Sequence, residues 1–324
     1  MKEKDLEEKK LFKQKCIVAI AIVLFFAAFM VIQTVESYLF DIFTGIVSVL
    51  AAVEISMILT KMGRPNYKGV VVAYPALLFV TFLTMMLLGC DAVELFLASL
   101  IIMAGLYLLT FVVSITLLKE DLTKDSFRIS TNMKLSQFAF YKTTNTLFGM
   151  YYPTFLFMFL YFINHITTLG FNNITATYGD YNIGIVGIIL SIGIACLSDT
   201  FANIFGRMIK GPKLCPKISP NKTISGFCFG LLGGAVAAIA TYFVFNAIFA
   251  GAFAGLGFWR FMLIGFFGSA VSSLGDLIES YLKRRANVKD ASNILRSHGG
   301  ILDRFDSIAL NIPFIFICLL LMLI

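Results

Sequence analysis

The chain has 324 residues, of which 59% are hydrophobic and 14% are charged, and its mean hydropathy is +0.87. Roughly a quarter of the residues of a soluble globular protein are charged, so this composition excludes that class. The net charge of +7 would suit a nucleic-acid-binding protein, but the basic residues cluster between long apolar segments, which argues against one.

Apolar segments of about 20 residues recur along the whole sequence, and each is long enough to cross a hydrocarbon core of ~30 Å. Because lipid offers backbone groups no hydrogen-bond partners, we expect helices, and no segment alternates as the strands of a barrel do. The predicted fold class is all-α, a polytopic membrane protein with about nine transmembrane helices. The expected spans are residues 16–33, 38–60, 69–89, 93–118, 144–163, 181–201, 224–249, 256–276 and 305–324.

The N-terminal segment, residues 1–15, mixes acids with bases, and no small-residue cleavage site follows it. We therefore expect a cytoplasmic head and a retained first helix rather than a removed signal peptide. Of the 26 Lys and Arg residues, 25 lie in this head or in every second connection between spans, and the remaining one is Arg260. This distribution follows the positive-inside rule, with a cytoplasmic N-terminus and an external C-terminus.

Four aspartates fall at the cytoplasmic ends of expected spans or just beyond them, and each has a basic cluster nearby. Ionisable groups so close to hydrocarbon are costly, so four of them at one membrane depth indicate a functional site. The four residues are Asp199, Asp276, Asp303 and Asp306.

Helical spacing predicts which side chains accompany these aspartates. Asp199, Ala202, Gly206 and Lys210 fall near one face of a helix, since they lie three or four residues apart. In the same way Ser280, Lys283 and Arg284 stack on the face of Asp276, and Asp303 and Asp306 share a face.

Carboxylates without clustered cysteine or histidine are hard oxygen ligands, which favour Mg²⁺. Mg²⁺ held by one or two carboxylates completes its shell with waters and substrate phosphates, while nearby Lys and Arg neutralise the other phosphate oxygens. The Gly299-Gly300 pair would let backbone N–H groups approach a phosphate, although alone it also fits a simple turn. The site therefore suggests phosphoryl or nucleotidyl transfer to a lipid. His298 could act in proton or phosphate transfer, or serve only as a structural hydrogen-bonding residue.

The segment SYLKRRANVKDASNILRSHGGILDRFDS, which begins at Ser280, closely resembles the signature of the phosphatidate cytidylyltransferase family. The positions that meet the signature are Ser280, Leu282, Lys283, Arg284, Lys289, Asp290, His298, Gly299, Gly300, Ile301, Asp303, Arg304, Phe305 and Asp306. Gly275-Asp276 and the loop with Lys222-Thr223 resemble further family motifs. The likeness covers roughly residues 140–324, and the first four spans match in hydropathy only.

This resemblance implies that CTP and phosphatidate give CDP-diacylglycerol and pyrophosphate, with the lipid phosphate attacking the α-phosphorus of CTP. It implies that Mg²⁺, with a second cation as an option, is held by Asp276, Asp303 and Asp306. Other motif residues would then bind the phosphates or the nucleotide. The residues implied for catalysis beside these aspartates are Lys283, Arg284, Lys289, Asp290, His298 and Arg304. Those implied for nucleotide binding are Asp199, Ser219, Lys222, Thr223, Gly299 and Gly300.

The resemblance also divides the chain into residues 1–140, a head with four membrane helices, and residues 141–324, a catalytic membrane domain. The expected location is a cell membrane, in particular a bacterial plasma membrane, with the site on the cytoplasmic face. The expected partners are CTP, phosphatidate and the lipid bilayer, with no nucleic acid, and a homodimer is one candidate assembly.

Three alternatives remain at this stage. A CTP-dependent kinase for a polyprenol or diacylglycerol would use similar carboxylates but would release CDP. A transporter would place ionisable residues near the bilayer midplane, where Glu54 is the one acid deep inside a span. A degenerate, non-catalytic homologue is disfavoured, because all four aspartates are present.

Overall fold

The computed structural model describes residues 37–171, 174, 182–249, 251, 253–292, 294 and 299–323. In these ranges eight helical segments are long and apolar enough to span a membrane, which confirms the all-α polytopic prediction. The segments are α2 (Ser37–Lys61), α3 (Lys68–Leu87), α4 (Ala92–Thr116), the continuous run of α7 (Leu135–Gly149), η1 (Met150–Phe155) and α8 (Leu156–Asn164), α10 (Ile183–Ile209), α11 (Ile224–Ile248), α12 (Phe258–Arg285) and α13 (Leu302–Leu323). The expected first span and the N-terminal head lie outside the described residues, so the count of nine and the orientation stay predictions.

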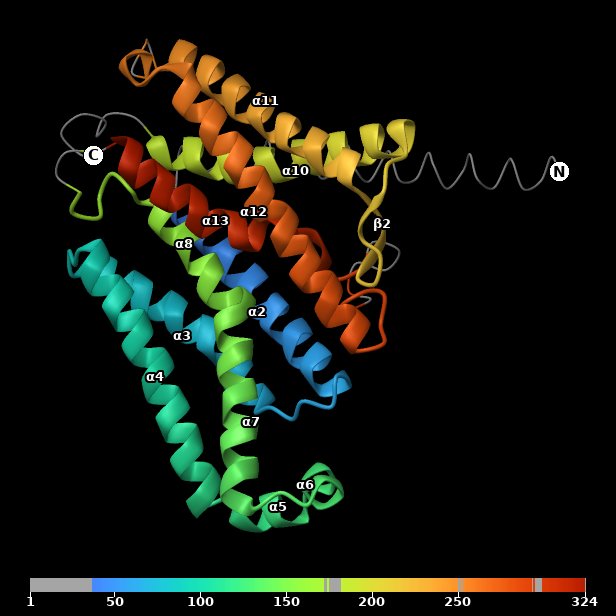
Figure 1. The fold of residues 1–324 in the computed structure, drawn as a ribbon. Coiled ribbons are helices and arrows are strands. Elements are labelled where there is room, and N and C mark those ends of the chain that lie inside the picture. Colours follow the sequence, from blue (N-terminus) through green and yellow to red (C-terminus); the bar gives the residue numbers. More distant parts are fainter. Residues whose placement is uncertain are drawn as a thin grey trace.

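The remaining elements are short. Helices α5 (Lys119–Lys124) and α6 (Ser126–Thr131) follow α4, and the 3₁₀ turn η2 (Ala254–Leu256) precedes α12. Strands β1 (Lys213–Cys215) and β2 (Ser219–Thr223) form an antiparallel hairpin between α10 and α11, in which Lys213 pairs with Thr223. In Figure 1 this hairpin lies beside the C-terminal end of α12, and α4, α7, α5 and α6 lie on the other side of the molecule.

Two helices continue well past the ends that hydropathy predicts. Helix α10 ends at Ile209 rather than 201, and α12 ends at Arg285 rather than 276. The α7 segment begins at Leu135 rather than 144. Helical hydrogen bonds join backbone groups and do not require apolar side chains. The charged residues therefore end the apolar segments but not the helices, and Asp199 and Asp276 lie inside helices.

Glycines let α10, α11 and α12 approach one another closely. A Cβ atom added to Gly233 of α11 would lie 2.7 Å from the Leu197 carbonyl oxygen of α10. A Cβ atom on Gly234 would lie 2.7 Å from the Gly265 carbonyl oxygen of α12. Small residues are the usual means of close helix packing in membranes, where lipid supplies no hydrophobic drive between helices.

Helix α13 packs against α12 in the same manner. A Cβ atom on Gly275 would lie 2.5 Å from the Asp306 carbonyl oxygen. Farther along α13, the buried Asn311 side chain donates a hydrogen bond to the Ser191 carbonyl oxygen of α10, at 2.9 Å. These contacts fix α13 against both neighbours and bring Asp306 next to the helix that carries Asp276.

A buried polar cluster joins α2 to the end of α8. The Asp41 carboxylate accepts a hydrogen bond from Asn164 Nδ2 at 2.9 Å and pairs with His165 Nε2 at 2.7 Å. Asp41 is fully buried, and the rings of Tyr38 and Phe82 lie beside the imidazole. The cluster therefore connects helices that lie more than 120 positions apart in the chain.

Replacing Asp41 with alanine should destabilise the fold, because His165 and Asn164 would keep their buried polar atoms without the shared acceptor. The expected loss is about 2–4 kcal/mol in the free energy of unfolding, measured as a lower thermal midpoint in detergent. Asp121→Asn on exposed α5 is the control. An Asp41→Ala midpoint equal to that of the control would contradict this role.

Candidate functional site

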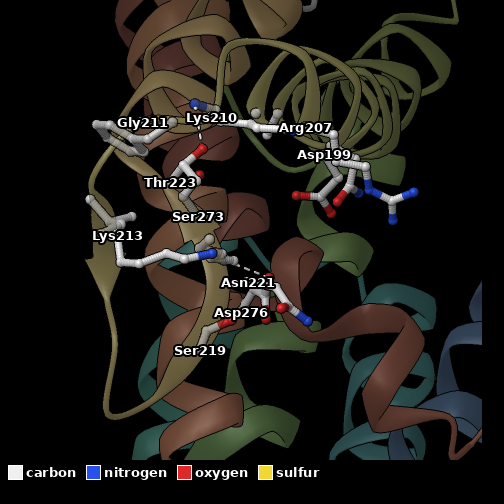
Figure 2. Close-up of a pocket in the computed structure, with 17 residues that line it drawn as sticks. Asp199, Arg207, Lys210, Gly211, Lys213, Ser219, Asn221, Thr223, Ser273 and Asp276 are labelled. Atoms are coloured by element: carbon white, nitrogen blue, oxygen red, sulfur yellow. Dashed lines mark hydrogen bonds and ion pairs between the residues drawn. The ribbon is translucent and has the colours of Figure 1, made fainter.

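A pocket of about 820 Å³ opens between α10, the hairpin, α11 and α12. Four basic side chains and two acidic ones line it: Arg207, Lys210, Lys213, Lys222, Asp199 and Asp276. Figure 2 shows that α10, the hairpin and α12 each contribute labelled side chains to this hollow. The excess of basic side chains makes the pocket suitable for an anion.

The predicted face of α10 forms one wall. Asp199, Ala202, Gly206 and Lys210 all line the pocket, which confirms the prediction that they share a face. Arg207 lies on the same wall and was not predicted, although its place three residues before Lys210 gave the signal.

The N-terminus of α11 forms a second wall. Thr223 caps this helix, because its hydroxyl accepts a hydrogen bond from the Gly226 N–H at 3.1 Å. The cap fits tightly against α10, since a Cβ atom on Gly206 would lie 2.8 Å from the Thr223 hydroxyl oxygen. The positive end of a helix dipole favours a bound anion such as a phosphate, so the backbone adds to the positive potential of the pocket.

Asp276 links the pocket wall to the hairpin. Its carboxylate pairs with Lys222 Nζ at 2.5 Å and accepts a hydrogen bond from Ser280 Oγ at 3.1 Å. The Ser280 contact confirms that these two residues stack on one face of α12. Because Lys222 comes from β2, this ion pair fixes the hairpin against the helix.

Carboxylates from three helices lie near one another beside the pocket. Asp199 of α10 and Asp306 of α13 each lie close enough to Asp276 for their charges to repel. The Ser307 hydroxyl lies between them, 3.1 Å from Asp199 Oδ2 and 3.0 Å from Asp306 Oδ1. Packing between α10, α12 and α13 thus brings three acidic side chains near one another.

A second cluster surrounds Lys283, which forms ion pairs with two buried acids. Lys283 Nζ pairs with Glu279 of the same helix and with Asp303 Oδ1 of α13, the latter at 2.8 Å. Asp303 also accepts backbone hydrogen bonds from Ala291 at 2.9 Å and from Gly300 at 2.7 Å. Asp303 is therefore surrounded by donors and organises the connection between α12 and α13.

The two glycines of the motif accommodate carboxylates. Gly299 has a positive φ of 77°, a conformation that favours glycine. A Cβ atom on Gly300 would lie 2.6 Å from the Glu54 carboxylate oxygens of α2. Since the Gly300 N–H already donates to Asp303, it is engaged within the protein, and the predicted contact of this pair with a nucleotide stays a prediction.

The carboxylates differ in how well they fit a metal ion. In the part of the chain that the structure describes, no three His, Cys, Asp or Glu side chains converge closely enough to form a metal site alone. The buried Tyr152 hydroxyl has no hydrogen-bond partner among the described residues and lies near Glu279, Asp306 and Asp276. Asp276 accepts two donors, from Lys222 and Ser280, and Asp306 accepts the N–H and the hydroxyl of Ser307, so both suit a cation that also takes oxygens from a substrate better than Asp303 does. Asp303 suits it less, because its oxygens already accept Lys283 and two backbone N–H groups.

Other residues of the signature lie outside the pocket. Arg284 Nε donates to the Ile218 carbonyl oxygen of the hairpin at 3.4 Å. Lys289, Asp290 and Arg304 are exposed on or beside the connection between α12 and α13. His298 lies outside the described residues. Its role stays a prediction, as do the roles of Lys289, Asp290 and Arg304.

Besides Arg207, two further contributors were missed from the sequence. Glu279 lies three residues after Asp276 and four before Lys283, a spacing that places all three on neighbouring faces of one helix. Lys213 had no such signal, because it reaches the pocket only through the pairing of β1 with β2.

The fold and the site together define a helical membrane protein with a basic, carboxylate-flanked pocket at its helix ends. The chain belongs to the cytidylyltransferase family, whose model matches residues 13–322.

Three relatives share this family likeness, and each is a phosphatidate cytidylyltransferase. The one from Staphylococcus haemolyticus is 41% identical over 154 residues, which cover 47% of this chain and 55% of the relative. The one from Rickettsia felis is 42% identical over 118 residues, 36% of this chain and 52% of the relative. The one from Staphylococcus aureus is 42% identical over 139 residues, 42% of this chain and 50% of the relative. Each matched stretch thus spans about half the length of the relative.

Replacing Lys283 with methionine should destabilise the protein strongly. Glu279 is fully buried and the Asp303 side chain is 7% exposed, so both acids would lose the cation that they share. Breaking a buried ion pair from one side costs about 3–5 kcal/mol, and the thermal midpoint in detergent should fall accordingly. The matched control is Arg285→Met, an exposed cation of the same helix. Equal midpoints for the two variants would contradict the role of Lys283.

Proposed function

We propose that this protein transfers the cytidylyl group of CTP to phosphatidate, giving CDP-diacylglycerol and pyrophosphate for phospholipid synthesis. The observation that carries the proposal is the pocket in which four cations and the N-terminus of α11 face carboxylates at helix ends. Membership of the cytidylyltransferase family and the names of the three relatives support the same reaction.

The nucleotide is assigned to the pocket between α10 and the hairpin. A triphosphate carries several negative charges, and Arg207, Lys210 and Lys213 offer matching positive charges on the walls. The Thr223 end of α11 adds a positive helix terminus. Polar side chains such as Ser219 and Asn221 line the same pocket and suit hydrogen bonds to the ribose or the base.

In this reaction a phosphate oxygen of phosphatidate attacks the α-phosphorus of CTP. A new P–O bond forms, the bond to the β-phosphate breaks, and pyrophosphate leaves with the bonding electrons. Since the attacking oxygen is already ionised, no general base is needed. The residues of the chain contribute by holding the two anions together and by neutralising the departing pyrophosphate, the kind of electrostatic stabilisation that lowers a barrier most.

We assign Mg²⁺ to Asp276 and Asp306, with Asp199 beside them, and a second cation stays an option. When bound, Mg²⁺ supplies Lewis-acid polarisation of phosphoryl oxygens. The close approach of these carboxylates and the unpartnered Tyr152 hydroxyl support the assignment. Asp303 belongs to the same motif, and we propose that it acts mainly by orienting Lys283 and the backbone before α13.

The site is assigned to the cytoplasmic face of a bacterial plasma membrane. If each long helix crosses the bilayer, the connections after α2, α4, α10 and α12 lie on one side. These connections carry the basic residues, and the positive-inside rule places such loops in the cytoplasm. CTP is a cytoplasmic nucleotide, so the assignment is consistent with the substrate, and the three relatives are bacterial proteins.

Replacing Asp276 with asparagine should lower the kcat by about 100-fold or more. A carboxylate that holds the metal ion would be lost, and a bound metal ion stabilises the transition state of such a transfer by several kcal/mol. The measurement is Mg²⁺-dependent pyrophosphate release by the detergent-purified protein given CTP and phosphatidate. Chelation of Mg²⁺ should abolish release by the wild type. Glu120→Gln on α5, with its side chain 90% exposed, is the matched control and should retain full activity.

Pyrophosphate release in this assay should require both CTP and phosphatidate. Pyrophosphate released without phosphatidate would indicate simple nucleotide hydrolysis. Release of CDP with a lipid alcohol as acceptor, and no pyrophosphate with phosphatidate, would replace the proposal with a CTP-dependent lipid kinase.

A further inference from the structure

Glu54 is a buried acid of α2, seven residues before the C-terminal end of the helix, and it is distant in sequence from every motif. Its side chain is fully buried, although α2 is a candidate membrane span. An ionisable group at such depth is costly unless it is paired, and it usually has a function. The partners of Glu54 therefore indicate why it is there.

Three donors surround the Glu54 carboxylate, two from the connection between α12 and α13 and one from the first residue of α13. The Ser292 hydroxyl donates to Oε1 at 2.5 Å. The backbone N–H of Ile301 donates to Oε1 at 2.9 Å, and that of Leu302 donates to Oε2 at 2.6 Å. Leu302 is the first residue of α13, so Glu54 caps this helix from another part of the chain.

The capped end of α13 carries two aspartates of the motif, Asp303 and Asp306. Asp303 and Asp306 lie one and four residues after Leu302. The space for the cap comes from Gly300, where any side chain would meet the Glu54 carboxylate. A shift of α13 would move Asp306 relative to Asp276 and Asp303 relative to Lys283.

We propose that Glu54 is a positioning residue, which holds the start of α13 so that Asp303 and Asp306 meet α12 in the reactive arrangement. This role adds a residue to the proposed cytidylyl transfer and rests on that proposal. It also gives the N-terminal part of the chain a direct part in the site. Glu54 does not line the nucleotide pocket, so its loss should affect the reaction step rather than CTP binding.

The test compares Glu54→Gln with Ser56→Ala in the full-length protein. Ser56 lies two residues away on α2 and is also buried, and its hydroxyl donates to Asn66 Oδ1 at 2.7 Å, away from α13. Glutamine keeps the size of Glu54 but directs an N–H₂ group at backbone donors. The first readout is hydrogen–deuterium exchange of the peptide that covers residues 299–304, and the second is the kinetics with CTP and phosphatidate.

For Glu54→Gln we expect exchange in this peptide to rise and kcat to fall, each by about tenfold, because hydrogen bonds to a carboxylate are lost. The KM for CTP should stay within about twofold of wild type. Ser56→Ala should leave both the peptide and the kcat unchanged. If Glu54→Gln fails to fold, Ser292→Ala, which removes one donor, should show the same split with about a threefold loss of kcat.

Unchanged exchange at residues 299–304 in Glu54→Gln would overturn the inference, whatever the activity of the wild type. Faster exchange with a kcat equal to that of Ser56→Ala would also overturn it, because the cap would then be structural only. A wild type that gives no product with CTP and phosphatidate would instead refute the proposed function, and the two failures are therefore distinguishable.

Discussion

The close packing of α12 against α13 brings Asp276 and Asp306 together, although their charges repel. The rest of the site compensates for this repulsion. Lys222 from the hairpin pairs with Asp276, and Lys283 pairs with Asp303 and Glu279. Two cations therefore pair with three acids of the site, and the protein can hold negative charge at helix ends where lipid alone would not stabilise it.

Helix α2 supports this arrangement through two buried acids near its opposite ends. Asp41 joins it to the end of α8, and Glu54 joins it to the start of α13. Both contacts replace the water that these polar groups would otherwise need, and both connect distant parts of the chain. The helices before residue 140 and those after it thus share polar contacts as well as apolar packing.

Much of the site could be predicted from sequence because its geometry is local. The face of α10 that begins at Asp199 follows from helical spacing, and the class of fold follows from apolar length. The ends of α10 and α12 were missed, because hydropathy falls at charged residues while the backbone hydrogen bonds continue. The partner of Glu54 could not be predicted, since Ile301 lies 247 positions away and no spacing rule joins them.

The most direct test of cytidylyl transfer is to follow the phosphates of CTP into lipid. CTP labelled with ³²P at the α-phosphate and CTP labelled at the γ-phosphate are each incubated with the purified protein, Mg²⁺ and phosphatidate. Cytidylyl transfer predicts label in the lipid product from the α-phosphate and none from the γ-phosphate. Label in lipid from the γ-phosphate alone, or no label in lipid from either, would contradict it.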